Sequence, residues 1–254
     1  MSKILQLQSL RGILCLIVVI VHYTPYENLL FHNHYLAGTA VITFFILSGY
    51  VLTLNYLFKI NSIDNLKIFF KKRFFRLYPL HLFFLLLFVI LEFIKYYVDQ
   101  NHYLDLNSEI FKENNIYSFL TNIFFVNTLN NYLSFNLPSW AVSAEFISSL
   151  IFGITILFFK NYFYILSIFI FILFVLIFNL NNYNLIQYNG FFSLYSCILS
   201  YYLGAIIFFY NKKKFFINII MHPLLQILNI VIFTFIITIQ YKTFIVLLNI
   251  SILL

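Results

Sequence analysis

Charged residues are scarce in this chain of 254 residues: they make up 9% of it, whereas hydrophobic residues make up 63%. A soluble domain has about 25% charged residues. A chain of this length is also too short to enclose so much apolar surface in a soluble core. The composition and the mean hydropathy of +0.93 therefore exclude a soluble protein. They predict an all-α, polytopic bundle of helices embedded in a lipid bilayer.

Cysteine is rare as well, and its placement excludes two further classes. Cys15 and Cys197 both lie in apolar stretches, which is typical of small buried side chains and gives no disulfide framework. His32 and His34 lack accompanying cysteines or carboxylates, so no metal site is predicted. The net charge of +7 comes from short basic clusters beside apolar stretches, which indicates membrane topology rather than nucleic-acid binding.

Long apolar runs predict seven spans, each near the 20 residues that cross a bilayer. They are Ile4–Tyr23, Tyr35–Phe58, Pro79–Val98, Pro138–Lys160, Tyr162–Leu180, Phe191–Tyr210 and Leu224–Gln240. Thr243–Leu254 is too short to span unaided, so we expect seven to eight spans. Ile116–Asn136 is semi-polar and is expected to be interfacial or re-entrant. No repeat or soluble domain is visible, so residues 1–254 are expected to form one membrane-embedded domain.

Basic residues set the predicted orientation. In the predicted topology, the basic groups at Lys59–Arg76, Lys160 and Lys212–Lys214 fall on one side of the membrane, and Lys242 is the exception. Because basic loops face the cytoplasm, this side is predicted to be cytoplasmic, and so is the N-terminus. Pro79 suits the first turn of a helix and is expected to begin the third span.

The first span has two ionisable residues where lipid is expected. Arg11 and His22 are eleven positions apart, which places them on one face of a helix, roughly 16 Å apart along its axis. Ionisable residues inside a membrane are costly and indicate function. A neutral imidazole is a general base near pH 7. The alternatives are an arginine that reaches the cytoplasmic interface and a helix-end histidine bonded to a carbonyl or to water.

Two further segments have candidate site residues. Arg73 and Arg76 are three apart at the cytoplasmic edge and should point the same way on a helix. They could bind a phosphate-rich ligand or anchor the chain beside anionic lipid. Glu145 is expected about 10 Å into the fourth span, on the outer side at the depth of His22, as a partner of the imidazole or of an unrelated donor. Trp140 is expected at the outer interface.

The other histidines are not expected in the site. His81 is expected to be interfacial, and His102 and His222 are expected in a loop and at a helix end.

Four segments together resemble the acyltransferase 3 family of integral membrane O-acyltransferases. They are LQSLRGILCLIVVIVHY, FFILSGYVLT, KKRFFRLYPLH and LPSWAVSAEF, which occur in the family's order and cover about Leu5 to Phe152. The rest of the chain matches only as generic apolar spans.

The resemblance implies transfer of an acyl group, usually acetyl from acetyl-CoA, to a hydroxyl of a cell-surface polysaccharide, such as lipopolysaccharide, or its lipid-linked precursor. Arg11 and His22 would be the essential pair, with His22 as the base or a transient acyl carrier. Glu145 would support the site, and Arg73 and Arg76 would bind CoA on the cytoplasmic side. Ser48 and Gly49 would determine the shape of the second helix where it packs by the cavity. Trp140 would lie on the substrate side.

The implied partners are acyl-CoA, the glycan acceptor and the lipid bilayer, with no bound cofactor, and the implied location is the plasma (inner) membrane of a bacterium. The oligomeric state is left open. The family has about ten spans, with a further motif in the last ones that this sequence does not show. We therefore expect a domain that lacks those spans. Two alternatives stay open: a transporter in which His22 and Glu145 relay protons, and an inactive remnant of the family.

Overall fold

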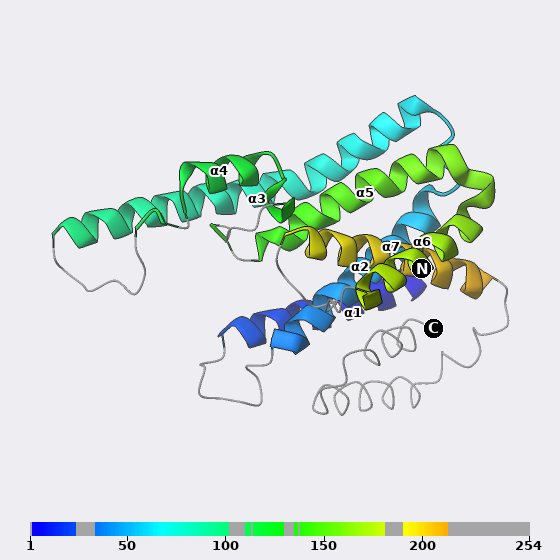
Figure 1. Ribbon diagram of the computed structural model, residues 1–254, viewed down its shortest axis with the longest axis horizontal. Helices are drawn as coiled ribbons and strands as arrows, with labels where there is room; N and C mark the ends of the chain where they lie inside the picture. The colour runs from blue at the N-terminus through cyan, green and yellow to red at the C-terminus, as the bar shows by residue number, and fades with distance from the viewer. Residues whose placement is uncertain are drawn as a thin grey trace. The chain divides into compact units, whose positions relative to one another are not determined.

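A computed structural model describes residues 2–23, 34–101, 110–112, 114–129, 135–136, 138–180 and 190–212. All regular structure within these residues is helical (Figure 1), which confirms the all-α prediction there. The α-helices are α1 (Ser2–Tyr23), α2 (His34–Tyr56), α3 (Ile63–Gln100), α4 (Ile116–Ile123), α5 (Ser139–Phe159), α6 (Phe163–Leu180) and α7 (Phe191–Lys212). Two short 3-10 helices complete the set, η1 (Asn127–Leu129) and η2 (Lys160–Tyr162).

Four helical stretches are long and apolar enough to cross a membrane. They are Leu36–Tyr56, Ile63–Gln100, Ser139–Ile177 and Phe191–Asn211, of which the third runs through α5, η2 and α6. Leu7–His22 in α1 is a shorter apolar helix. The predicted span Leu224–Gln240, the segment Thr243–Leu254 and Lys242 lie outside the described residues. The total of seven to eight spans and the cytoplasmic N-terminus thus stay predictions.

Helix α3 differs from its prediction. It runs without interruption over 38 residues, or about 57 Å, and the expectation that a helix begins at Pro79 is wrong. Ser62 already caps the N-terminus, because its side chain accepts a hydrogen bond from the backbone N–H of Asn65. Pro79 lies inside the helix, where its missing N–H removes one helical hydrogen bond. The basic segment before Pro79 is therefore mostly helical.

The chain divides into two compact units, which are described separately. The first contains α1, α2, α6 and most of α7. There, α1 packs on α2 through a cluster made of Leu14, Ala40 and Leu47, with Leu7, Leu10, Ile17, Val18 and Phe44 around it. The α1 members recur every three or four residues, so they form one face of the helix.

Helices α2 and α7 cross at backbone contact. A Cβ added to Gly49 would lie 2.7 Å from the Cα of Tyr201, and one added to Gly204 would lie 2.6 Å from the backbone N of Tyr50. The two glycines thus remove the side chains that would keep the helices apart. The sequence-based expectation that Gly49 permits close helix approach is confirmed.

The second unit contains α3, α4, η1, α5 and residues 188–195. In it, α3 and α5 pack antiparallel. A Cβ added to Gly153 would lie 2.6 Å from the ring of Phe69, and the rings of Phe74 and Phe146 are 6.2 Å apart. Residue numbers therefore increase along α3 in the direction in which they decrease along α5, as expected for two antiparallel helices. The second half of α3 instead contacts α4, which lies alongside it (Figure 1).

Candidate active site

In the first unit, α1 places Arg11 and His22 beside its packing face. Leu14 and Val21 are buried, whereas Arg11 is half-buried and His22 is exposed. At 100° per residue, Arg11 and His22 lie about 20° apart around the helix. The helix predicted from the sequence is confirmed, and so is the shared stripe.

The His22 ring is held by its own helix. Its Nδ1 lies 2.7 Å from the carbonyl oxygen of Val18. Because a carbonyl only accepts, Nδ1 must carry the proton, and in the neutral ring Nε2 then keeps its lone pair. The sequence-based alternative of a helix-end histidine bonded to a carbonyl is thus realised through Nδ1, and this bond does not use Nε2.

In the second unit, Arg73 and Glu145 form an ion pair between α3 and α5. Arg73 Nη2 lies 3.4 Å from Glu145 Oε1, and the two side chains are 5% and 22% exposed. Phe146, next to Glu145, stacks on Phe125 with ring centroids 5.0 Å apart. Apolar packing beside a charge pair lowers the local dielectric and strengthens the attraction.

This contact overturns one prediction. Arg73 and Glu145 were expected at opposite ends of the site, one at the cytoplasmic edge and one near the outside. They touch because α3 begins well before Pro79 and runs antiparallel to α5, which brings Arg73 level with Glu145. A buried guanidinium also requires a counter-charge.

The other candidate residues have separate surroundings. Arg76 is exposed whereas Arg73 is buried, so the structure does not bring the two arginines together as one clamp. Ser48 is buried on α2 beside Gly49, at the crossing with α7. Trp140 is half-buried in the first turn of α5.

Sequence reasoning missed the burial of His81. This residue was expected to be interfacial, but it is only 8% exposed. Its Nε2 donates to the carbonyl oxygen of Asn122 at 2.9 Å, and its ring stacks on Phe125 with centroids 4.6 Å apart. Phe125 has a positive φ of 58°, which is rare for a bulky residue and marks strain. His81 therefore supports the strained turn after α4.

A buried polar network joins this turn to α5. Ser139 Oγ donates to Asn122 Oδ1 at 3.1 Å and accepts from Asn127 Nδ2 at 3.0 Å. Ser143 Oγ donates to the carbonyl oxygen of Phe125 at 2.7 Å. Buried polar groups with partners of this kind fix one arrangement of the backbone, so the network positions the α5 turn that holds Glu145.

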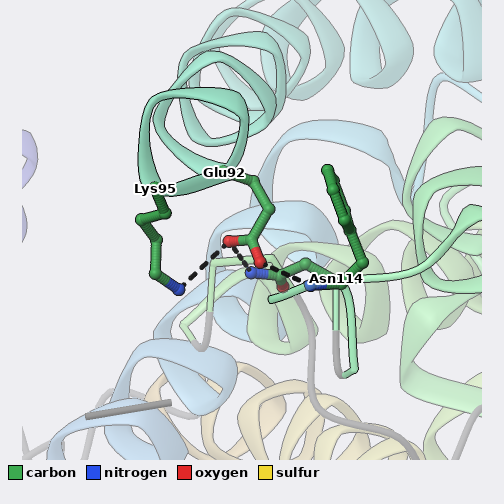
Figure 2. A network of polar contacts seen from close by, with 4 residues as sticks. Glu92, Lys95 and Asn114 are labelled. Carbon is green, nitrogen blue, oxygen red and sulfur yellow. Dashed lines mark hydrogen bonds and ion pairs between the residues drawn. The ribbon is translucent and has the colours of Figure 1, made fainter. Parts of the chain in front are cut away.

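Glu92 was also missed, although it stands in the apolar half of α3 and is 3% exposed. Figure 2 shows Lys95 and Asn114 directed at its carboxylate. Lys95 Nζ and Asn114 Nδ2 lie 3.3 and 2.8 Å from Glu92 Oε2, and the backbone N–H of Phe111 donates to Oε1 at 3.0 Å. An acidic residue inside an apolar run is itself a signal. The bonds around Glu92 tie the segment before α4 to α3.

Within the described part of the chain, no group of three or more His, Cys, Asp or Glu residues could hold a metal ion. His32, His102 and His222 lie outside it.

Comparison with known proteins gives one result that covers most of the sequence. The family model described as an acyltransferase domain matches residues 4–253, well beyond the Leu5 to Phe152 over which the four segments resemble the family. No curated protein and no solved structure gave a significant match. With its apolar helices and a match over nearly its whole length, the chain belongs to the acyltransferase 3 family of membrane acyltransferases.

Proposed function

We propose that this protein transfers an acyl group, most simply acetyl from acetyl-CoA, to a hydroxyl of a cell-surface polysaccharide or its lipid-linked precursor. The observation that supports this best is the family match together with His22, whose Nδ1 is bonded to the Val18 carbonyl, on the same stripe as Arg11. The proposed location is the plasma (inner) membrane of a bacterium, with the lipid bilayer as solvent and no bound cofactor.

In the proposed reaction, His22 Nε2 takes the proton of the acceptor hydroxyl while the hydroxyl oxygen attacks the thioester carbonyl. The carbon–sulfur bond breaks, and the CoA sulfur leaves with the proton that His22 returns. In the alternative route, Nε2 itself attacks and carries the acyl group before the hydroxyl takes it. Both routes need the Nδ1–H bond to Val18, because it fixes which nitrogen is free.

The remaining residues have supporting roles in this proposal. Arg11 lies roughly 16 Å along the helix axis from His22, so it would contact the acyl donor away from the reacting carbonyl. Arg76 is exposed and could contact a CoA phosphate, for which a guanidinium is well suited. Arg73 is held by Glu145, so we propose that it fixes the carboxylate and contributes to CoA binding only through that contact.

The roles of Ser48, Gly49 and Trp140 are proposals as well. We propose that Ser48 and Gly49 shape α2 and that Trp140 lies on the substrate side.

The transporter alternative receives less support. A relay carboxylate must be available to accept a proton, whereas Glu145 already forms an ion pair with Arg73 between α3 and α5, at 3.4 Å. We therefore prefer acyl transfer.

The test is transfer of radiolabelled acetyl from CoA to extracted surface polysaccharide, with membranes from cells that carry or lack this gene. We expect label in polysaccharide only when the gene is present. Equal labelling in both would refute the proposal and favour an inactive remnant. Substrate uptake by proteoliposomes without acyl donor would instead favour a transporter.

A further inference from the structure

Besides the ion pair of the candidate site, an aromatic residue of the turn after α4 joins α3 to α5. The ring of Phe125, which is 2% exposed, stacks on two others. They belong to His81 on α3 and Phe146 on α5, with centroids 4.6 and 5.0 Å away and interplanar angles of 25° and 28°. Tyr78 on α3 adds a third ring at 5.4 Å. Aromatic pairs of this kind attract each other beyond the area that they bury, so Phe125 bridges the two helices.

Phe125 also contacts α5 through its backbone. Its carbonyl oxygen accepts a hydrogen bond from Ser143 Oγ at 2.7 Å. Ser143 and Phe146 are three positions apart, which is nearly one helical turn, and Glu145 lies between them in the sequence. Two contacts within one turn fix the rotation of α5 about its axis there, and the side chain of Glu145 turns with the helix.

His81 holds this bridge at its α3 end. The carbonyl oxygen of Asn122 accepts from the backbone N–H of Phe125 at 3.2 Å and from His81 Nε2 at 2.9 Å. His81 thus contacts both the ring of Phe125 and the carbonyl to which Phe125 itself donates. The positive φ of Phe125, 58°, is costly for a bulky residue and persists only where surrounding contacts over-determine it. Contacts from His81, Ser143 and Phe146 do so here.

We propose that His81 is a positioning residue for the Arg73–Glu145 pair. Through Phe125 it sets the rotation of α5, and with it the direction from which the Glu145 carboxylate meets the guanidinium 3.4 Å away. The role requires no contact of His81 with substrate and involves no covalent chemistry. It rests on the proposed function, in which Glu145 supports the site of acyl transfer.

The test is a double-variant cycle on the full-length protein, in which thermal unfolding in detergent is compared for wild type, H81L, E145Q and H81L/E145Q. If His81 acts on the ion pair, H81L should cost less stability once E145Q has already removed the carboxylate. We expect the effect of H81L on the unfolding equilibrium constant to shrink by about five-fold in the E145Q background, because residues in one network couple by about that amount.

L66A is the matched control for this cycle. Leu66 is buried in the same helix interface, beside Gly153, and is two turns away from Arg73 along α3. Its effect on the unfolding equilibrium constant should therefore agree within about two-fold in the two backgrounds.

Acetyl transfer to surface polysaccharide separates the two contacts of His81. H81L removes both the ring and the N–H donor, whereas H81F keeps a ring and H81Q keeps a donor. We expect transfer to fall about 10- to 100-fold for H81L, because a misplacement of about 1 Å can cost that much, and to fall less for H81F and H81Q. At equal amounts of folded protein, L66A should retain more transfer than H81L.

An H81L effect on unfolding of the same size with and without E145Q would overturn the proposal. So would transfer by H81L within two-fold of wild type, or equal to that of L66A, because His81 would then contribute stability alone. Absence of transfer by wild type would refute the proposed function instead, since the unfolding cycle still decides whether His81 acts on the ion pair.

Discussion

At the scale of single residues, the Arg73–Glu145 pair joins two helices through one contact. Glu145→Gln would leave the guanidinium of Arg73, only 5% exposed, without its counter-charge. Removal of one partner of a buried pair costs on the order of 3 kcal/mol. We therefore expect a clearly lower melting temperature in detergent.

A double variant separates structure from chemistry at this pair. Arg73→Met combined with Glu145→Leu replaces the charges by apolar groups, which is often neutral for stability. We expect it to recover most of the lost melting temperature while acetyl transfer stays low. Recovery of both stability and transfer would show that the pair is structural only.

Glu92 gives a second prediction at the residue scale. Glu92→Leu removes the acceptor of the Phe111 N–H and of Asn114, and a hydrogen bond to a charged group contributes about 1.5–3 kcal/mol. Hydrogen exchange at the Phe111 amide should become roughly 10- to 100-fold faster. Asp99→Asn, which changes an exposed acid on the same helix, is the matched control. Equal exchange in both variants would contradict the account of Glu92.

The residues also show which contacts a sequence can predict. The Arg11–His22 stripe follows from spacing on one helix, so periodicity was enough to find it. Arg73 and Glu145 are 72 positions apart, and their contact depends on how α3 and α5 align. The Phe111 donor is a backbone N–H, which every residue except proline has, so no residue type marks it.

At the scale of elements, the crossing of α2 and α7 depends on two glycines. Gly204→Ala would drive a Cβ into the backbone of Ile46 and Tyr50, and overpacking of this kind costs about 1–3 kcal/mol. We expect a lower melting temperature in detergent.

Gly12→Ala is the control for that crossing, because an added Cβ there meets nothing within 4 Å. Alanine is the better helix former by up to about 1 kcal/mol, so this variant should melt at the same or a higher temperature. A Gly204→Ala variant as stable as Gly12→Ala would contradict the close crossing.

Helix α3 shows why boundaries are harder to predict than apolar stretches. Pro79 favours a helix start, and the cations before it favour a loop. The capping bond of Ser62 and the packing of Phe69 at Gly153 outweigh the hydrogen bond that Pro79 loses. The sequence predicted the apolar half correctly, because length and hydropathy suffice there. It could not weigh a cap and a tertiary contact against a proline.

At the scale of the whole molecule, composition alone predicted the class of protein, because 9% charged residues leave no soluble alternative. Four candidate spans within the described residues agree with that class, and the family match extends it to acyl transfer. The chemistry still depends on one side chain, since only His22 is proposed to move the proton.

The most direct measurement is acetyl transfer to surface polysaccharide by membranes that contain equal amounts of wild type, His22→Ala and His102→Ala. The sequence places His102 in a loop, so its variant serves as the matched control. Loss of a general base lowers the rate about 10²- to 10⁴-fold, so we predict transfer reduced at least about 100-fold for His22→Ala and unchanged for His102→Ala. Transfer by His22→Ala within a few-fold of wild type would contradict the assignment of His22 as the reacting base.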